Sequence, residues 1–191
     1  MVWKNDQVSE IETKKILEIA REQVGFPGDF VELGCYKGDT SLLLAEVLKG
    51  SSQKLWIYDS FEGLPEKSQE DASVMGIDFK GGELFVTKRE VKERFLRAGL
   101  PVPIIKKAWF ADLKLEDLPE KIALAFLDGD FYDSIKDSLE LVESKMNSGA
   151  KMIIHDYNNE ALPGVKKAVN EWLAGKNLKK EAFQSMLVIT L

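Results

Sequence analysis

The sequence predicts an α/β fold, in which one mostly parallel sheet of seven strands carries helices on both faces, within a single domain over residues 1–191. Short apolar runs alternate with stretches of helical periodicity, which is the pattern of repeated βαβ units. The run at 122–127 is apolar throughout and the run at 150–154 is apolar except for Lys151, as expected of central strands covered on both faces. After Asn177 there is room only for two short strands and a turn, which predicts a C-terminal antiparallel hairpin.

The elements can be assigned in order along the chain. An N-terminal helix is expected within 1–27, over about 7–24, because Gly25 and Pro27 would end it. The other expected elements are strands at 29–34, 54–59, 101–107, 121–128 and 150–156, and helices at 39–49, 83–98, 131–146 and 161–174. Residues 60–82 show no periodicity, and loops of that length in compact domains are mostly functional or disordered. We therefore predict an active-site loop there.

Composition and charge exclude several classes of function. The chain has 26 basic and 32 acidic residues, so the positive footprint of a nucleic-acid binder is missing. No apolar stretch reaches the roughly 18 to 20 residues that span a bilayer, and the N-terminal segment lacks the apolar core of a signal peptide. The single Cys35 excludes an intramolecular disulfide. We expect a soluble cytoplasmic protein with a small-molecule partner, no nucleic-acid or membrane partner, and a homodimer as a further option.

Polar residues stand where the predicted strands end. In an open parallel sheet, ligands bind outside the carboxyl ends of the strands, at the point where the strand order reverses. The residues at those ends are Glu32 and Gly34, Asp59, Asp128 and Asp130, and His155 and Asp156. A purely structural sheet does not need acidic residues at these ends. The pattern therefore predicts a ligand site along this edge.

The first strand leads into the stretch ELGCYKGDTS. Gly34 and Gly38 would let the backbone approach a ligand, although a simple strand-to-helix turn explains these glycines equally well. Asp39 or Thr40 would cap the next helix. The spacing is not the G-x-G-x-x-G fingerprint that binds a pyrophosphate. Asp59 would accept hydrogen bonds from both ribose hydroxyls, or would cap the turn SFEGLP. A nucleoside pocket without a phosphate grip fits S-adenosylmethionine.

Further side chains would complete this pocket. Glu32 would hold the methionine end, and Phe61 or Trp109 would cover the adenine face. The full set of predicted cofactor contacts is Glu32, Gly34, Cys35, Tyr36, Gly38, Thr40, Ser41, Asp59, Ser60, Phe61, Trp109 and Asp128.

The stretch LDGDFYDS places two carboxylates at the end of a strand and the start of a helix. Helix capping by Asp130, with Asp133 in the first turn, accounts for these two acids but leaves Asp128 unexplained. Asp128 and the pair His155–Asp156 end adjacent strands, so their oxygen and nitrogen atoms predict a divalent-metal site. For His155 a structural histidine with satisfied hydrogen bonds is the alternative.

These motifs together resemble those of a known family. They are FVELGCYKGDTS, YDSFEGLP, KKAWFADLKLEDLP, FLDGDFYDS and IIHDYNNEALPGVKKAVNEW, which follow one another over about residues 28–174. The chain resembles the macrocin O-methyltransferase family, whose members are S-adenosylmethionine-dependent sugar O-methyltransferases of antibiotic biosynthesis. The resemblance implies a Rossmann-like class I methyltransferase sheet that binds S-adenosylmethionine at Glu32, Gly34, Gly38 and Asp59.

The resemblance also implies a magnesium ion beside the acceptor hydroxyl. By position, Asp128 and Asp156 match the metal ligands of the family, and Asp130 matches its catalytic base. His155 departs from the pattern, because it stands where the family has the first Asp of D-D-Y. A nitrogen ligand should weaken Mg²⁺ binding and favour Mn²⁺, Fe²⁺, Co²⁺ or Zn²⁺. Alternatively, the metal is lost and His155, with an ordinary pKa of about 6.5, is itself the general base.

The predicted activity is methyl transfer from S-adenosylmethionine to a hydroxyl of a small molecule, with a sugar as the favoured acceptor. The segment before Asp29 is shorter than in many members of the family, so the acceptor pocket would depend mainly on loop 60–82. A second hypothesis is a non-catalytic domain that binds the cofactor. A third, an NAD-dependent oxidoreductase, is disfavoured by the glycine spacing.

Overall fold

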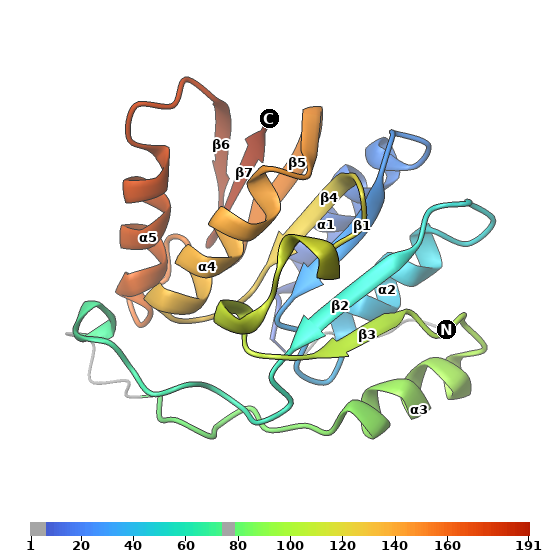
Figure 1. Ribbon diagram of the computed structural model, residues 1–191, viewed down its shortest axis with the longest axis horizontal. Helices are drawn as coiled ribbons and strands as arrows, with labels where there is room; N and C mark the ends of the chain where they lie inside the picture. Colours follow the sequence, from blue (N-terminus) through green and yellow to red (C-terminus); the bar gives the residue numbers. More distant parts are fainter. Residues whose placement is uncertain (1–6, 74–78) are drawn as a thin grey trace.

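The structure, a computed structural model, describes residues 7–73 and 79–191 (Figure 1). Its helices are α1 Glu10–Gln23, α2 Asp39–Val47, α3 Lys88–Ala98, α4 Tyr132–Glu143 and α5 Pro163–Leu173. Its strands are β1 Asp29–Leu33, β2 Leu55–Asp59, β3 Ile104–Lys107, β4 Ile122–Leu127, β5 Met146–Ile154, β6 Lys179–Phe183 and β7 Met186–Thr190. Short 3₁₀ turns, η1 Gln69–Asp71, η2 Phe110–Asp112 and η3 Leu115–Asp117, lie in the connections.

The described strands form one sheet in the order β3-β2-β1-β4-β5-β7-β6. β1 to β5 are parallel to their neighbours, whereas β7 runs antiparallel to both β5 and β6. The predicted mostly parallel sheet and C-terminal hairpin are therefore confirmed. Because the chain moves outward from β1 in one direction and then returns to add β4 on its other side, the strand order reverses between β1 and β4.

Alternate residues of the central strands supply two cores, one on each face of the sheet. Phe30 packs with side chains of α1, α2 and α3, whereas its neighbour Val31 packs with α4 and α5. Figure 1 shows this division, with α4 and α5 in front of the sheet and α1 and α2 behind it. Burial on both faces explains why β4 is apolar along its whole length.

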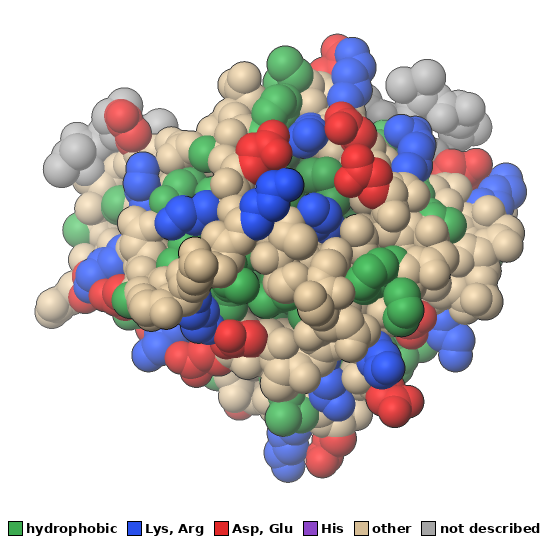
Figure 2. Space-filling view, turned by 90° about the horizontal axis from the view of Figure 1, so that it is seen from above, with side chains coloured by type: hydrophobic (Ala, Val, Ile, Leu, Met, Phe, Trp, Pro, Cys, Tyr) green, Lys and Arg blue, Asp and Glu red, His purple; other side chains and the backbone are tan. Residues whose placement is uncertain are grey.

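Some boundaries differ from the predicted ones. α3 begins at Lys88 rather than near residue 83, because the Thr87 hydroxyl accepts the Glu90 N–H while the Glu90 carboxylate accepts the Thr87 N–H. β5 begins at Met146 rather than 150, since Met146 pairs with Ile122 at the start of β4. In the described parts of the chain, no helix is long and apolar enough to cross a membrane. On the face seen in Figure 2, basic and acidic side chains are interspersed.

Candidate active site

The turns that follow β1, β2, β4 and β5 share an unusual backbone conformation. Each contains a residue other than glycine in the left-handed region: Tyr36 at φ 45°, Phe61 at φ 51°, Asp130 at φ 62° and Asp156 at φ 57°. Side chains with a Cβ seldom adopt this conformation, and it persists where the surrounding structure enforces it, often at functional sites. Four of the six described residues other than glycine in this conformation thus lie at the edge of the sheet at which the sequence predicts a ligand; the other two are Leu84 and Gln184.

A cavity of about 290 Å³ opens at this edge. Acidic side chains from the ends of β1, β2, β4 and β5 line it, together with the turn after β1 and an apolar wall from the following loops. The acidic members are Glu32, Asp39, Asp59, Asp128, Asp130 and Asp156. Among the described residues, Lys37 is the one Lys or Arg of the wall. The cavity therefore suits a ligand that carries positive charge.

Asp59 connects β2 to the turn after β1. Its Oδ2 accepts the backbone N–H groups of Cys35 at 2.9 Å and Tyr36 at 3.2 Å, and its Oδ1 accepts that of Phe61 at 2.7 Å. The alternative that Asp59 caps the following turn is thus observed. The carboxylate also lines the cavity, so hydrogen bonding to a ribose stays a prediction that this geometry permits.

Glycine is needed at the two positions of the first turn for structural reasons other than the expected approach to a ligand. A Cβ on Gly34 would lie 2.0 Å from the carbonyl oxygen of Asp128, so the ends of β1 and β4 could not come this close. Gly38, at φ 80°, is the N-cap residue of α2, and no side chain caps the helix there. The expectation that Asp39 or Thr40 is the cap was therefore wrong, because the helix already starts at Asp39, which instead pairs with Arg94.

Glu32 is a buried acid at the end of β1. It is 1% exposed and accepts a short hydrogen bond from the Ser41 hydroxyl. Burial raises the pKa of Glu32 to about 8, despite the Ser41 hydrogen bond, and the nearby charges of Asp128 and Asp59 act in the same direction. A cationic group in the cavity would offset those charges and favour ionised Glu32.

Replacing Glu32 with Gln should make the protein more stable at alkaline pH. Between about pH 4.5 and about pH 8 the native protein holds a proton on Glu32 that the unfolded chain has lost, so the free energy of unfolding falls as the pH rises through this window. Each unit of pKa difference corresponds to about 1.4 kcal/mol. Urea unfolding on both sides of the window should show a flatter pH dependence in Glu32→Gln, whereas the exposed control Glu46→Gln should follow the wild type. An unchanged slope in Glu32→Gln would contradict the assignment.

Asp128 and Asp130 flank the turn after β4. The Asp128 N–H donates to the carbonyl of Leu33 at 2.8 Å, which fixes the start of the turn against β1. Asp130 faces the cavity and is not the cap of α4, contrary to the capping interpretation, because Phe131 occupies the N-cap position. Burial, followed by the charges of Asp128 and Asp156, raises the pKa of Asp130 well above its usual range.

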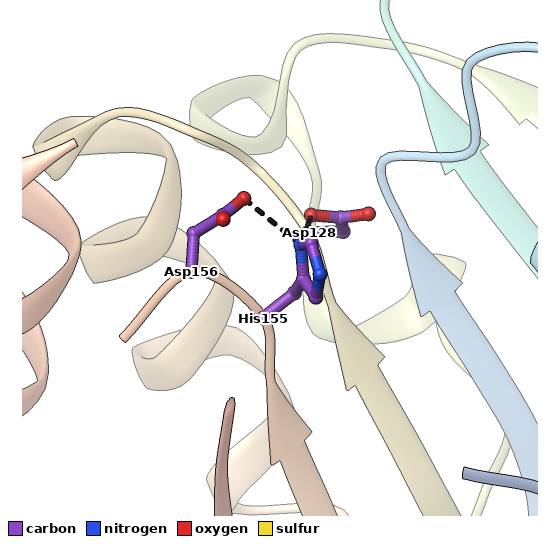
Figure 3. Close-up of side chains that lie close together, drawn as sticks. All are labelled: Asp128, His155 and Asp156. Carbon is purple, nitrogen blue, oxygen red and sulfur yellow. Dashed lines mark hydrogen bonds and ion pairs between the residues drawn. The ribbon is translucent and has the colours of Figure 1, made fainter. Parts of the chain in front are cut away.

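Asp128, His155 and Asp156 converge at the ends of β4 and β5. His155 Nδ1 lies 3.0 Å from Asp128 Oδ1 and 2.9 Å from Asp156 Oδ2, and Figure 3 shows the imidazole between the two carboxylates. One candidate ligand atom from each residue lies within 4.8 Å of the others. Asn159 donates to the second oxygen of Asp156 at 2.8 Å and so orients that carboxylate. The set fits a divalent cation with mixed oxygen and nitrogen ligands.

The protonation of His155 follows from this arrangement. Burial alone would lower the pKa of His155, but the charges and hydrogen bonds of Asp128 and Asp156 outweigh it and raise the pKa to about 11. The charge and hydrogen bond of His155 in turn lower the pKa of Asp156 against the effect of burial. Without a metal, His155 is therefore an imidazolium, and its proton occupies the position that a cation would take. A protonated imidazole can neither accept a proton nor bind a metal, so either role requires His155 to lose this proton, and in the ligand role the cation displaces it.

Most of the predicted site residues line the cavity, and three do not. Those on the wall are Glu32, Gly34, Cys35, Tyr36, Thr40, Asp59, Ser60, Trp109, Asp128, Asp130, His155 and Asp156. Gly38 and Ser41 lie behind it, where Ser41 supports Glu32. Phe61 is 3% exposed in the core beneath α2 and α3, so it does not form the expected adenine cover. Trp109 on the wall remains available for that contact.

The sequence did not reveal the whole wall. The predicted loop 60–82, the segment between it and α3, and the connections after β3 and β5 contribute further wall residues: Leu64, Pro65, Phe79, Leu84, Phe110 and Leu162. Apolar residues in a segment without periodicity give no sequence signal for a cavity. Part of the predicted loop, 74–78, lies outside the described residues. Lys37 and Asn159 could have been suspected from their places beside Gly38 and in the HDYNN stretch.

Comparison with known proteins identifies sequences that are similar to this chain. Residues 7–186 match the family described as macrocin-O-methyltransferase (TylF). A tetracenomycin-C rhamnosyl 4'-O-methyltransferase of Streptomyces olivaceus is 32% identical over 156 residues, which are 78% of this chain and 59% of that protein. The demethyldecarbamoylnovobiocin O-methyltransferase of Streptomyces niveus is 28% identical over 81% of this chain and 62% of its own length. The chain thus spans about three fifths of the length of these curated relatives.

Solved structures agree with the fold. The O-methyltransferase NovP superposes with a TM-score of 0.81 at 25% identity, over 94% of this chain and 78% of that one. The calicheamicin methyltransferase CalS11 has a TM-score of 0.76 at 16% identity, over 95% of this chain and 80% of its own. The architecture is therefore that of known O-methyltransferases.

Proposed function

Because the chain belongs to the macrocin O-methyltransferase family, we propose that it transfers a methyl group from S-adenosylmethionine to a hydroxyl of a small molecule, with a natural-product sugar as the acceptor class. One observation carries this proposal: Asp128, Asp130 and Asp156 reach the same cavity as the turn that Asp59 clamps. A donor pocket and a set of groups able to activate a hydroxyl thus lie side by side.

The charge of the cavity supports S-adenosylmethionine as the methyl donor. S-adenosylmethionine carries a sulfonium and an ammonium group but no phosphate, and the wall combines acidic side chains with a turn that lacks the phosphate-binding glycine pattern. Glu32 lies beside the first turn, where it would face the methionine end, and Asp59 would face the ribose.

Methyl transfer requires the protein mainly to position the acceptor oxygen relative to the methyl group. The acceptor oxygen forms a bond to the methyl carbon while the carbon–sulfur bond breaks, and its electron pair stays on sulfur to give S-adenosylhomocysteine. Holding the oxygen in line with that bond supplies much of the acceleration. The acceptor proton goes to Asp130, which faces the cavity and must be ionised to accept it.

Asp128, His155 and Asp156 would hold a divalent cation beside the acceptor. Such an ion, when bound, lowers the pKa of the acceptor hydroxyl and orients it. Because one of the ligands is an imidazole nitrogen, we propose Mn²⁺, Fe²⁺, Co²⁺ or Zn²⁺ ahead of Mg²⁺.

The acceptor class is supported by the apolar residues that line the cavity together with the acids. A glycoside has hydroxyls for the acidic side and an apolar aglycone or deoxy-sugar face for Leu64, Phe110 and Leu162. Two relatives are named for the O-methylation of a rhamnosyl tetracenomycin and of demethyldecarbamoylnovobiocin, which are natural products. The cytoplasm as the site of action and a homodimer as the working form stay predictions from the sequence.

S-adenosylhomocysteine is expected to raise the melting temperature, because a ligand that binds only the native state stabilises it, whereas NAD should not. Incubation with S-adenosylmethionine, Mn²⁺ and methyl α-L-rhamnoside should then give a product heavier by one methylene unit. Stabilisation by NAD but not by S-adenosylhomocysteine would overturn the assignment of S-adenosylmethionine as the methyl donor. If S-adenosylhomocysteine stabilises the protein but no methyl group is transferred to any of a panel of sugar and phenol hydroxyls, the result would favour a non-catalytic binding domain. The departure from the family pattern at His155 is the observation behind that second hypothesis.

A further inference from the structure

The first turn of α4 is capped by a residue far away in the sequence. Phe131 stands at the N-cap and has no side-chain acceptor, so the free N–H groups of the helix need another partner. The N–H of Tyr132 donates to Oδ1 of Asp71 at 2.7 Å, across 61 residues of chain. Asp71 is 1% exposed, and its negative charge lies at the positive end of the helix.

Asp71 is itself fixed from several sides. Its Oδ2 accepts the Ser68 N–H at 3.1 Å and the Ser68 hydroxyl at 2.7 Å, which closes the turn η1. The neighbouring Glu70 pairs with Lys167 of α5, and Figure 1 shows η1 beside that helix. A Cβ on Gly164 would lie 1.9 Å from Asp71 Oδ1, so the start of α5 leaves room only for this carboxylate.

This cap has a consequence for Asp130. The sequence alone favours Asp130 as the N-cap of α4, and in that role its carboxylate would turn toward the helix N–H groups. In the structure Asp71 takes the cap, the helix starts one residue later than it would with Asp130 as the N-cap, and Asp130 keeps its left-handed backbone with its side chain at the cavity. Without Asp71, Asp130 is the nearest acid in the chain able to cap an extended α4.

We propose that Asp71 is a positioning residue for methyl transfer, which holds the turn 128–131 in the conformation that presents Asp130 to the acceptor. The proposal rests on the proposed function, because it is there that Asp130 receives the proton. Asp71 lies outside the wall of the cavity, and its contact with this region is the hydrogen bond to Tyr132, so it would act through the turn.

The test compares the removal of two helix caps. Asp71→Ala removes the cap of α4, and Thr87→Ala removes the matched cap of α3, away from the cavity. Both should lower the melting temperature, and Asp71→Ala should do so more, because Asp71 is buried and accepts three hydrogen bonds. Only Asp71→Ala should speed amide exchange over 128–135 and lower kcat on methyl α-L-rhamnoside, roughly 10- to 100-fold, since small misplacements of a reacting group have effects of this size. The affinity for S-adenosylhomocysteine should stay within about threefold of the wild type.

Two further variants separate positioning from loss of structure. Asp71→Asn keeps an oxygen that can accept the Tyr132 N–H, so it should recover most of the lost kcat. Gly164→Ala crowds both partners of this hydrogen bond, the Asp71 carboxylate and the Cβ of Tyr132, without altering either residue, and should reproduce both the faster exchange and the lower kcat. If kcat of Asp71→Ala matches that of Thr87→Ala, or if exchange over 128–135 does not change, the proposal is overturned.

The exchange measurement does not depend on catalysis. If the wild type transfers no methyl group, the proposed function fails, while faster exchange over 128–135 in Asp71→Ala would still establish that Asp71 holds the turn. If the wild type is active and exchange is unchanged, the positioning role fails and the proposed function stands.

Discussion

Replacing Asp130 with Asn is expected to lower kcat for methyl transfer by roughly 10²- to 10⁴-fold, which is the usual contribution of a positioned general base. Asn keeps the size of the side chain and tolerates the left-handed backbone at φ 62° that Asp130 adopts. It cannot accept the proton of the acceptor hydroxyl. Affinity for S-adenosylhomocysteine should change little, so a radiometric transfer assay paired with calorimetry of the cofactor product separates the two effects.

The pH profile gives this variant a second readout. Burial and the charges of Asp128 and Asp156 raise the pKa of Asp130, so the carboxylate form that accepts the proton grows as the pH rises. The wild-type kcat should therefore increase with pH along this ionisation, and the residual activity of Asp130→Asn should not. Asp133→Asn is the matched control, because Asp133 is an exposed acid in the first turn of the same helix. Near-normal activity of Asp130→Asn would rule out the base role.

Replacing His155 with Asp is expected to reverse the metal preference of the site. The wild type should bind Zn²⁺ or Mn²⁺ more tightly than Mg²⁺, because Nδ1 of His155 replaces an oxygen ligand. The variant would offer carboxylates only, so Mg²⁺ affinity should rise and Zn²⁺ affinity should fall, by at least the roughly 10- to 100-fold that changes around a metal site produce. Titration calorimetry with each ion, with and without S-adenosylhomocysteine, measures both.

His155→Asn provides the control for charge, since it removes the imidazole without adding a carboxylate. Proton release gives an independent check: the Asp128 and Asp156 carboxylates raise the pKa of His155 to about 11, so a metal must displace that proton. Metal affinity of the wild type should therefore increase with pH more steeply than that of His155→Asp. Absence of binding of Mg²⁺, Mn²⁺ and Zn²⁺ by the wild type under all these conditions would refute the site.

Local pattern determined the fold to a large degree. The apolar run at 122–127, and that at 150–154 with its single Lys151, indicated buried strands, and the periodicity between the runs indicated covering helices, so a parallel sheet was expected and is observed. Because parallel strands place their carboxyl ends along one edge, the sequence alone predicts that Asp128 and the pair His155–Asp156 lie close together. These inferences need only the order of residues and the geometry of the chain.

The roles of individual groups needed contacts between distant parts of the chain. Gly34 is required by the Asp128 carbonyl, and the helix cap that the sequence assigned to Asp130 comes from Asp71. Propensity cannot foresee such a contact, since it sees only neighbours in sequence. The charge on His155 is likewise set by two carboxylates that the fold brings within 3.0 Å of Nδ1. The sequence by itself determined the architecture and the edge that carries the site; the tertiary structure decided which groups hold protons and which are free to act, because both depend on distances in space.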